Sequence, residues 1–488
     1  MKIQSISATA DTIRLTLDEP LAEPADLSVY SPLYGTETDP LITLPMPAGQ
    51  ATLSLPRDAA GRDGICLRYV LTAGGQTVPG KRYVESITDA PRTYPYPQVE
   101  TKKGLQISDA QDAKILGVRH SAINVNEGDF LLPAPVEGNT IEYVLDGRVF
   151  YFNKKIVEEN DKRLKDLTDI GVVITLILLN SRHWTLQVPD DFWAVIRHPD
   201  YADSPDALIS QFNLHTEEGL ALYRAFISFL ADRYTREDGQ YGHIYGMIVG
   251  NEVNSGYVWC NAGEKSVDDY VKEYTQVVRL TWQTAAAVYQ NIRIYLSFDH
   301  FWRDANFGNN QPMRYYGTKP MLEILNRLCL EEGQVPWHIA FHPYPQDLNY
   351  PDYWNDTDAT DDDNTSIITF KNLEVLARFT YEPAFLCNGQ RRRIILSEQG
   401  FNSHWTVESE VLQAAAYGHA YRKIMSIPEI DSFILHAHRD NRLEFGLNLG
   451  LWRRKKDGDE LDAPKPIYYV FKAIDQKDER GVYHWERY

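Results

Sequence analysis

Two different patterns of apolar residues divide the chain near residue 95. In roughly the first 90 residues, apolar and polar positions alternate over short segments such as Ile13-Leu15-Leu17 and Leu53-Leu55, with clusters of Pro, Gly and Asp between them. Alternation with a period of two is typical of strands with one buried face. Cys66 to Thr72, Gly74-Gly75 and Gln76 to Val78 predict a hairpin. Because no helical periodicity interrupts this region, we expect a small β-sandwich.

The proline-rich segment Pro91-Arg92-Thr93-Tyr94-Pro95-Tyr96-Pro97 predicts a stiff, extended linker. We therefore expect an N-terminal domain with its linker over residues 1–95 and a second domain over residues 96–488. The first domain has no tryptophan to offer a sugar, so we expect it mainly to support the second. Sugar binding, shaping of the cleft and dimerisation stay open as alternatives.

Beyond the linker, short apolar runs alternate with amphipathic segments, which is typical of parallel β/α units. Strands are predicted at 104–107, 118–125, 172–179, 244–250, 292–298, 337–342, 393–397 and 432–436. Helices are predicted after a capping pattern formed by Ser108 and Gln111, and then at 156–170, 217–234, 266–285, 321–331, 367–379, 408–426 and 467–475. Eight repeats of strand plus helix predict an α/β fold, a (β/α)8 TIM barrel preceded by the β-sandwich.

Composition narrows the possible partners. A formal net charge of -19 and a pI near 5.2 disfavour nucleic acid and anionic membranes, so we expect a neutral substrate. The N-terminal residues lack the apolar run of a signal peptide, which predicts a cytoplasmic protein unless a leader has been removed. The four cysteines are widely spaced, which predicts free thiols. The oligomeric state is left open.

The ends of three predicted strands carry the candidate chemistry. Asn251-Glu252 follows the fourth strand, His342-Pro343-Tyr344 the sixth, and Glu398 the seventh. Active sites of (β/α)8 barrels lie at this end of the strands. Two carboxylates are what cleavage of a glycosidic bond needs, although a single glutamate at a strand end is as readily a structural ion-pair residue.

This combination of strand ends resembles glycoside hydrolase clan A over roughly residues 100–475. The resemblance implies a retaining glycosidase without cofactor or metal, in which Glu252 is the acid/base and Glu398 the nucleophile. It further implies that Asn251 binds the sugar 2-hydroxyl, that Tyr344 donates a hydrogen bond to the nucleophile, and that His342 lines the same subsite. The chain departs from the clan at strand two, where Arg119 stands near the start, and after strand eight, where a tryptophan is often found and this chain has His436-Ala437-His438.

Other polar and aromatic residues near strand ends are candidate sugar ligands, because sugars offer both hydroxyls and apolar ring faces. Each of them could instead serve packing or a structural hydrogen bond. They are Asn124, Asn126, Asn180, Trp184, Trp259, Asp299, His300, Trp302, Trp405, His436 and His438.

Three alternatives to a hydrolase with a carbohydrate substrate remain at this point. A transglycosylase would use the same glutamates, and a carbohydrate-binding barrel would have lost catalysis. A metal-dependent barrel hydrolase would use His436 and His438, if both lie on one face of a strand. The acidic segment Asp352 to Asn364 lacks the glycine and glutamate of an EF-hand, so we expect a solvated loop rather than a calcium site.

Overall fold

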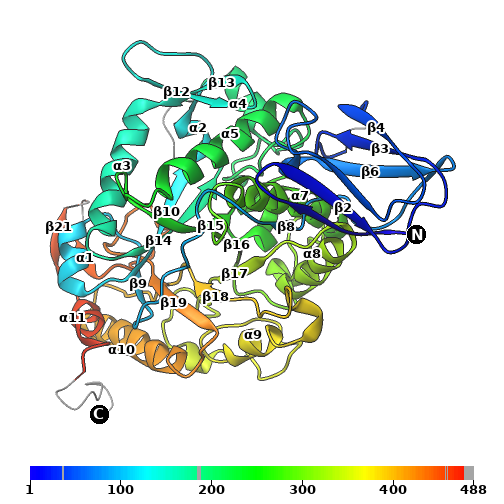
Figure 1. Cartoon of the computed structure of the whole chain (residues 1–488). Helices are drawn as coiled ribbons and strands as arrows, with labels where there is room; N and C mark the ends of the chain where they lie inside the picture. The colour runs from blue at the N-terminus through cyan, green and yellow to red at the C-terminus, as the bar shows by residue number, and fades with distance from the viewer. Residues whose placement is uncertain (36–37, 184–187, 457, 459, 478–488) are drawn as a thin grey trace.

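A closed barrel of eight parallel strands forms the centre of the molecule (Figure 1). The computed structural model describes residues 1–35, 38–183, 188–456, 458 and 460–477. Around the barrel the strand order is β10-β14-β15-β16-β17-β18-β19-β9, which confirms the predicted (β/α)8 fold. The strands are β9 (Lys103–Leu105), β10 (His120–Asn126), β14 (Val173–Leu179), β15 (Ile244–Val249), β16 (Arg293–Phe298), β17 (Trp337–Phe341), β18 (Ile394–Leu396) and β19 (Ile430–Leu435).

Apolar side chains on both faces hold these strands in place. Every residue of β14 is buried, as its nearly continuous apolar run predicts. Small and large apolar side chains fill the barrel interior, among them Ala122, Ile177, Ile248, Tyr295, Ala340, Ile395 and Ile434. Because the interior is packed, a substrate can reach only the mouth of the barrel.

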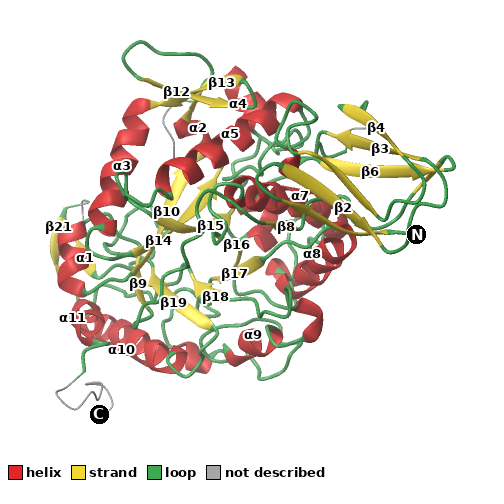
Figure 2. Cartoon of the chain, in the orientation of Figure 1, coloured by secondary structure: helices red, strands yellow, loops and turns green. Residues whose placement is uncertain are grey.

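Helices surround the barrel and shield its outer face (Figure 2). They are α1 (Ala110–Leu116), α3 (Lys154–Thr168), α5 (Glu217–Tyr234), α7 (Val267–Ala286), α8 (Thr318–Glu332), α9 (Glu374–Phe379), α10 (Val407–Ile424) and α11 (Pro466–Ala473). Side chains of Thr216, Ser266 and Thr406 cap α5, α7 and α10 by accepting a backbone N–H of the first turn.

Two predicted helix starts are wrong. Asp109 caps α1, accepting from the amides of Gln111 and Asp112, so the cap lies one residue after Ser108. The helix predicted over 367–379 is helical only in α9, because the Asn372 side chain accepts from the amide of Thr369 and donates to nearby carbonyls. Such local side-chain bonds compete with helix formation.

The connections at the mouth contain elements that the sequence pattern did not predict. Between β10 and α3 lie α2 (Glu127–Phe130) and a small antiparallel sheet of β11 (Leu131–Leu132), β12 (Thr140–Leu145) and β13 (Arg148–Asn153). The turn between β12 and β13 is Asp146-Gly147 with positive φ at both residues, a recognisable hairpin signal. Other connections at the mouth carry α4 (Asp190–Ile196), η2 (Val253–Ser255), α6 (Gly256–Trp259), η3 (Asn306–Asn309), η4 (Tyr353–Asn355), β20 (Trp452–Arg454) and β21 (Leu461–Pro464). At the opposite end of the barrel, η5 (Pro383–Phe385) lies between α9 and β18.

The N-terminal region forms two four-stranded sheets, as expected for a β-sandwich. One has the order β5-β2-β1-β8 and the other β4-β3-β6-β7; their members are β1 (Ile3–Ala8), β2 (Thr12–Leu17), β3 (Ala25–Tyr30), β4 (Ile42–Met46), β5 (Thr52–Pro56), β6 (Arg68–Ala73), β7 (Gln76–Thr77) and β8 (Ser86–Ile87). The predicted hairpin is β6–β7. A short helix, η1 (Gly64–Cys66), packs on α7, so this region lies beside the barrel helices rather than over the mouth (Figure 1).

The cysteine prediction is confirmed, because all four cysteines are buried and free. Within the described ranges, no helix combines the length and the apolar character that crossing a membrane requires.

Candidate active site

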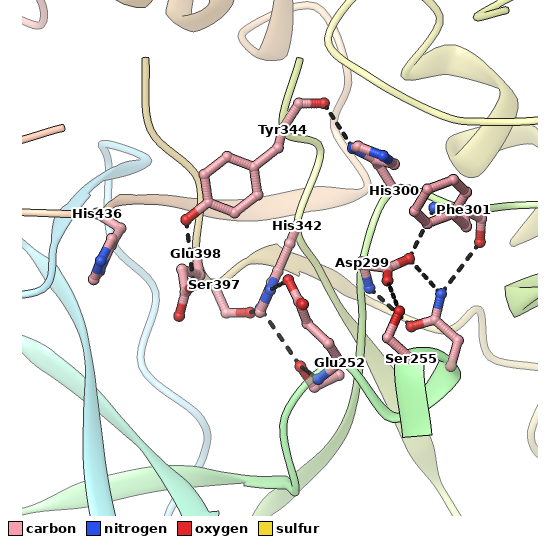
Figure 3. A network of polar contacts seen from close by, with 12 residues as sticks. Glu252, Ser255, Asp299, His300, Phe301, His342, Tyr344, Ser397, Glu398 and His436 are labelled. Atoms are coloured by element: carbon pink, nitrogen blue, oxygen red, sulfur yellow. Dashed lines mark hydrogen bonds and ion pairs between the residues drawn. The ribbon is translucent and has the colours of Figure 1, made fainter. Parts of the chain in front are cut away.

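Glu252 leaves the end of β15 with an unusual backbone. Gly250 has φ +75° and Glu252 itself has φ 38° and ψ 53°, both in the left-handed region. A non-glycine residue in that region is strained and persists only where its surroundings hold it. The amide of Glu252 donates to Ser297 Oγ at 3.0 Å, which ties the strained turn to the end of β16. From this turn the Glu252 carboxyl reaches the His342 ring (Figure 3).

His342, just after β17, joins the two strand ends that carry the glutamates. Its Nδ1 lies 2.9 Å from Glu252 Oε1, and its Nε2 lies 3.0 Å from Ser397 Oγ. The ring is 1% exposed, so these contacts fix its orientation. Figure 3 shows His342 between Glu252 and the segment that bears Glu398.

Glu398 follows β18 and is held by neutral donors. Tyr344 Oη donates to Glu398 Oε1 at 3.2 Å, and Gln106 Nε2 donates to Glu398 Oε2 at 3.4 Å. Oxygen atoms of Glu252 and Glu398 and a nitrogen of His342 all lie within 4.8 Å of one another. Carboxyl groups at this spacing can act on one bond from two sides.

The surroundings separate the pKa values of the two glutamates. Burial raises the pKa of Glu252 from 4.5 to about 7, with the hydrogen bond from His342 opposing part of that rise. Burial also acts to raise the pKa of Glu398, but His436, His342 and the hydrogen bonds from Gln106 and Tyr344 outweigh it and hold this pKa below 4.5. Near neutral pH, Glu252 can therefore carry a proton while Glu398 is ionised.

A buried network behind Glu252 supports its turn. Asp299, after β16, accepts from the side chains of Asn254 and Ser255 and from the amide of Phe301 at 2.9 Å (Figure 3). Asn254 and Ser255 belong to η2, which directly follows Glu252. The network anchors η2 to the neighbouring strand end, as expected where a strained residue must be held.

A cavity of about 430 Å³ adjoins the site through Gln106, which donates to Glu398 and also lines the cavity. Gln106, Asn124 and His436 line it, and His436 Nδ1 donates to Gln106 Oε1 at 2.6 Å. In Figure 3, Glu398 lies between His436 on one side and Glu252 with His342 on the other. The cavity therefore continues the site from the ionised glutamate toward β9, β10 and β19.

The connection after β19 reaches across the mouth. Phe445, in this connection, packs edge-to-face on Trp259 with ring centroids 6.1 Å apart. Trp259 ends α6, after β15, which lies opposite β19 in the closed barrel. Glu444 Oε1 lies 3.0 Å from His436 Nε2, close enough for an ion pair although the angle does not make a hydrogen bond. The connection after β19 therefore covers part of the site.

Comparison with known proteins places the chain in a family. Residues 95–485 match the sequence profile of a family described as "Family of unknown function (DUF5722)". The chain belongs to this family. No curated protein matches it.

Solved structures similar to this DUF5722 chain include a family 39 glycoside hydrolase from Bacteroides cellulosilyticus WH2, with 14% identity, 97% of this chain and 82% of that chain covered, and a TM-score of 0.49. A β-glucosidase from Pyrococcus furiosus is 13% identical, with a TM-score of 0.47. The match covers 75% of this chain and 83% of the β-glucosidase. A family 1 β-glucosidase from Thermotoga maritima is 11% identical, with a TM-score of 0.45. The match covers 75% of this chain and 85% of that enzyme. The fold of this chain is established by its own closed barrel of eight parallel strands.

Several predicted ligands of the DUF5722 chain do lie at the mouth. Asn251 is half-buried next to Glu252 and makes no side-chain hydrogen bond to the described part of the chain. Asn124 and His436 line the cavity. His300 is 9% exposed and its Nδ1 lies 3.2 Å from the carbonyl of Tyr344, so it positions the residue that donates to Glu398. Trp259 is half-buried under Phe445.

Other predicted ligands are corrected by the structure. Asn180 is fully buried and donates to the carbonyl of Ile196, and Trp302 is 1% exposed and donates to the carbonyl of Asp363, so both serve packing. Asn126 exchanges two hydrogen bonds with the backbone of Ser181 and joins two strand ends.

Of the remaining two predicted tryptophans, the structure describes one. Trp405 is 37% exposed beneath the Arg454 guanidinium, 5.1 Å from its ring centroid. Trp184 lies outside the described residues.

Sequence reasoning missed three residues of the site. Gln106, at the end of the first strand, touches both Glu398 and His436, and the strand-end rule could have found it. Ser397 was not predicted, because it directly precedes Glu398 and the sequence pattern includes it in the strand. Glu444 lies in a long connection where no pattern marks it.

The pair proposed as metal ligands, His436 and His438, does not come together. β19 ends at Leu435, so the two residues are not on one strand face, and His438 Nε2 instead contacts Asp112 Oδ2 at 2.6 Å. Within the described residues, one group of possible ligands besides the glutamate pair with His342 lies within 4.8 Å: His198, His215 and Glu273.

This second group is already internally paired. His198 Nδ1 accepts from the amide of Asp200 at 3.1 Å, so Nε2 bears the ring proton and donates to Glu273 at 3.0 Å. Lys265 Nζ also binds Glu273, at 2.8 Å. Because a metal ligand needs a free nitrogen lone pair, this donor set does not fit a metal ion.

Proposed function

We propose that the chain is a retaining glycoside hydrolase that cleaves β-type bonds of an oligo- or polysaccharide. One observation carries the proposal: two carboxyls lie within 4.8 Å of each other at the mouth of the barrel, one with its pKa raised to about 7 and the other with its pKa held below 4.5. A retaining mechanism needs carboxyls about 5–5.5 Å apart, one protonated and one ionised.

In the first step, Glu398 attacks the anomeric carbon while Glu252 gives its proton to the leaving oxygen, and the glycosidic bond breaks. The products are an ester between the sugar and Glu398, and a free leaving group. Tyr344 and Gln106 keep the attacking carboxylate in position through their hydrogen bonds.

In the second step, Glu252, now ionised, takes a proton from a water molecule whose oxygen attacks the anomeric carbon. The ester bond breaks and Glu398 is ionised again. The sugar leaves with its original anomeric configuration. If a sugar hydroxyl replaces the water, the same site acts as a transglycosylase.

The nucleophile assignment is tested with Glu398→Ala on a panel of activated aryl β-glycosides, furanosides included. We expect a folded protein with turnover reduced at least about 10⁴-fold. A 2-deoxy-2-fluoro analogue of the best substrate should add one sugar mass to wild-type Glu398, located by peptide mass spectrometry. Glu331→Gln, on the exposed face of α8, serves as the control. Wild-type turnover in Glu398→Ala, or labelling of another residue, would contradict the assignment.

The acid/base assignment is tested with Glu252→Ala. Aryl groups that leave easily need little protonation, so the loss should be small for them and large for poor leaving groups. Azide should restore part of the turnover and yield a glycosyl azide of retained configuration, visible by NMR. Equal losses on good and poor leaving groups would count against this role. Transfer to added sugar acceptors in the same assays would favour a transglycosylase.

A further inference from the structure

Charged side chains line the cavity beside Glu398, and nearly all of them have a partner of opposite charge. The contacts join Arg439 to Asp109 at 3.3 Å, His436 to Glu444 at 3.0 Å, and His438 to Asp112 at 2.6 Å. A pocket lined only by such pairs would present little net charge to a ligand.

Arg163 is the exception in this lining. It lies on α3 and lines the same cavity. Within the described part of the chain it makes no ion pair or hydrogen bond, and its Nε is shielded from solvent without a partner. Burial lowers the pKa of Arg163, and no nearby carboxylate opposes that effect.

Arg163 is half-buried, and an arginine whose charge is partly removed from water is normally paired, because an opposite charge recovers the free energy lost with its hydration. The other arginine of the cavity lining, Arg439, is exposed and still pairs with Asp109. The missing partner of Arg163 is therefore expected to come with the ligand. The guanidinium fork matches the oxygen atoms of a carboxylate or a sulfate.

The position of the cavity indicates which part of a substrate would reach Arg163. In the proposed reaction the proton donor Glu252 faces the leaving group, so the sugar that becomes bound to Glu398 extends the other way. His436 lies on that other side of Glu398 (Figure 3) and lines the cavity together with its hydrogen-bond partner Gln106 and with Arg163.

We infer that this cavity holds the glycone and that Arg163 pairs with an anionic oxygen group on it, either the carboxylate of a uronic acid or a sulfate ester. The inference rests on the proposed function for its substrate orientation. It changes the expectation of a neutral substrate, which follows from the net charge of -19. That charge is an average over the whole surface, whereas recognition depends on the unpaired cation within the cavity.

The first test compares aryl β-glycosides in matched sets, each with a uronic acid, a sulfated sugar and the neutral parent sugar. For each enzyme, the ratio of kcat/KM on the acidic sugar to that on its neutral parent is measured. We expect the wild type to prefer one acidic form, and Arg163→Gln to lower the ratio about 10- to 100-fold, the range of one lost charge-assisted contact. Whichever acidic form is preferred distinguishes carboxylate from sulfate.

Two further variants complete the set. Arg163→Lys keeps the charge without the fork and should lower the ratio less than Arg163→Gln. Arg327→Gln removes an exposed arginine of α8 and should leave the ratio as in the wild type. A ratio that favours the neutral sugar and is the same in the wild type and Arg163→Gln would overturn the inference while leaving the glutamate mechanism intact.

A binding measurement separates this inference from the proposed function. Glu398→Gln and the double variant with Arg163→Gln are titrated by calorimetry with acidic and neutral oligosaccharides, without any need for turnover. Tighter binding of an acidic oligosaccharide that is lost in the double variant would support the inference even if no glycoside is hydrolysed. Equal binding of acidic and neutral oligosaccharides by both proteins would overturn it. Melting temperatures of all variants show whether they are folded.

Discussion

Glu252 and Glu398 have identical side chains, but the residues around them shift the pKa values of their carboxyl groups in opposite directions. Glu252 is buried beside one histidine, whereas Glu398 also faces His436 and accepts from Tyr344 and Gln106. Burial favours the neutral acid, and cations or donors favour the carboxylate. The chemistry proposed for the site therefore depends on their immediate neighbours.

His342 is expected to set the upper pH limit of activity. The rate should fall as pH rises through about 7, because Glu252 then loses the proton it must donate. His342 lowers the pKa of Glu252, so His342→Gln should raise that pKa and move the alkaline limb of kcat/KM to higher pH. The pH profile of each enzyme measures this. A limb that stays in place, or moves to lower pH, would contradict the role given to His342.

Tyr344 is expected to set the position of the acidic limb of the pH profile. Its hydrogen bond lowers the pKa of Glu398, so Tyr344→Phe should raise that pKa, and a higher pH is then needed to ionise the nucleophile. The acidic limb should move to higher pH, and kcat should fall roughly 10-fold through loss of one hydrogen bond to a charged group. Tyr350→Phe is the control, because the Tyr350 side chain is 60% exposed. An unchanged acidic limb would show that the hydrogen bond does not tune the nucleophile.

The elements that shape the site are the connections at the mouth of the barrel. The barrel strands place Glu252 and Glu398, but the segment between β19 and β20 determines how open the site is. It contacts the opposite side of the mouth through Phe445 on Trp259, and it contacts His436 through Glu444. A substrate bound next to Glu398 must therefore lie beneath or alongside this segment.

Phe445→Ala tests whether the contact of this segment with Trp259 contributes to substrate binding. Loss of an aromatic contact worth about 0.5–1.5 kcal/mol should raise KM for oligosaccharides roughly 2- to 10-fold with a smaller effect on kcat. Leu443→Ala is a matched control, because Leu443 is 76% exposed and Phe445 is 72% exposed in the same segment. Steady-state kinetics on a short and a long substrate give the comparison. Equal effects of the two substitutions would show that the ring contact has no particular part in binding.

At the scale of the whole molecule, the N-terminal sheets and the barrel share a polar, well-buried contact. Arg279 on α7 is fully buried, donates to the carbonyl of Gly333 at 2.5 Å and lies over the ring of Tyr83, 4.4 Å from its centroid. The amides of Arg82 and Tyr83 donate to the carbonyl of Glu332, at the end of α8. These contacts agree with a supporting role for the N-terminal region.

Arg279→Met is expected to destabilise the whole chain. The methionine keeps the apolar stem but leaves the Gly333 carbonyl without its donor, which costs roughly 1–3 kcal/mol. The free energy of unfolding is measured by chemical denaturation, with Arg327→Met on the exposed face of α8 as the control. A change below about 0.5 kcal/mol, no larger than that of an ordinary surface substitution, would argue against a structural role for this contact.

The sequence predicted the barrel and the glutamate pair because both depend on local information. Runs such as Val172 to Leu179 are apolar on every face only where a strand is covered on both sides, and the eight-fold alternation of strands and helices follows from such runs. A glutamate directly after a strand lies at the mouth wherever the strand is parallel and in the barrel. Neither inference needs a contact between distant residues.

The tertiary structure alone decided which residues besides the glutamate pair line the site. Asn180 and Trp302 follow strands in the same way as Glu252, yet both are buried, because the connections around the mouth fold over them. Arg163 belongs to a helix on the outside of the barrel and still lines the cavity, which no strand-end rule predicts. Periodicity along the chain determines the strands and their ends. The solvent exposure and charge pairing of a side chain depend on segments hundreds of residues away, so they follow only from the folded structure.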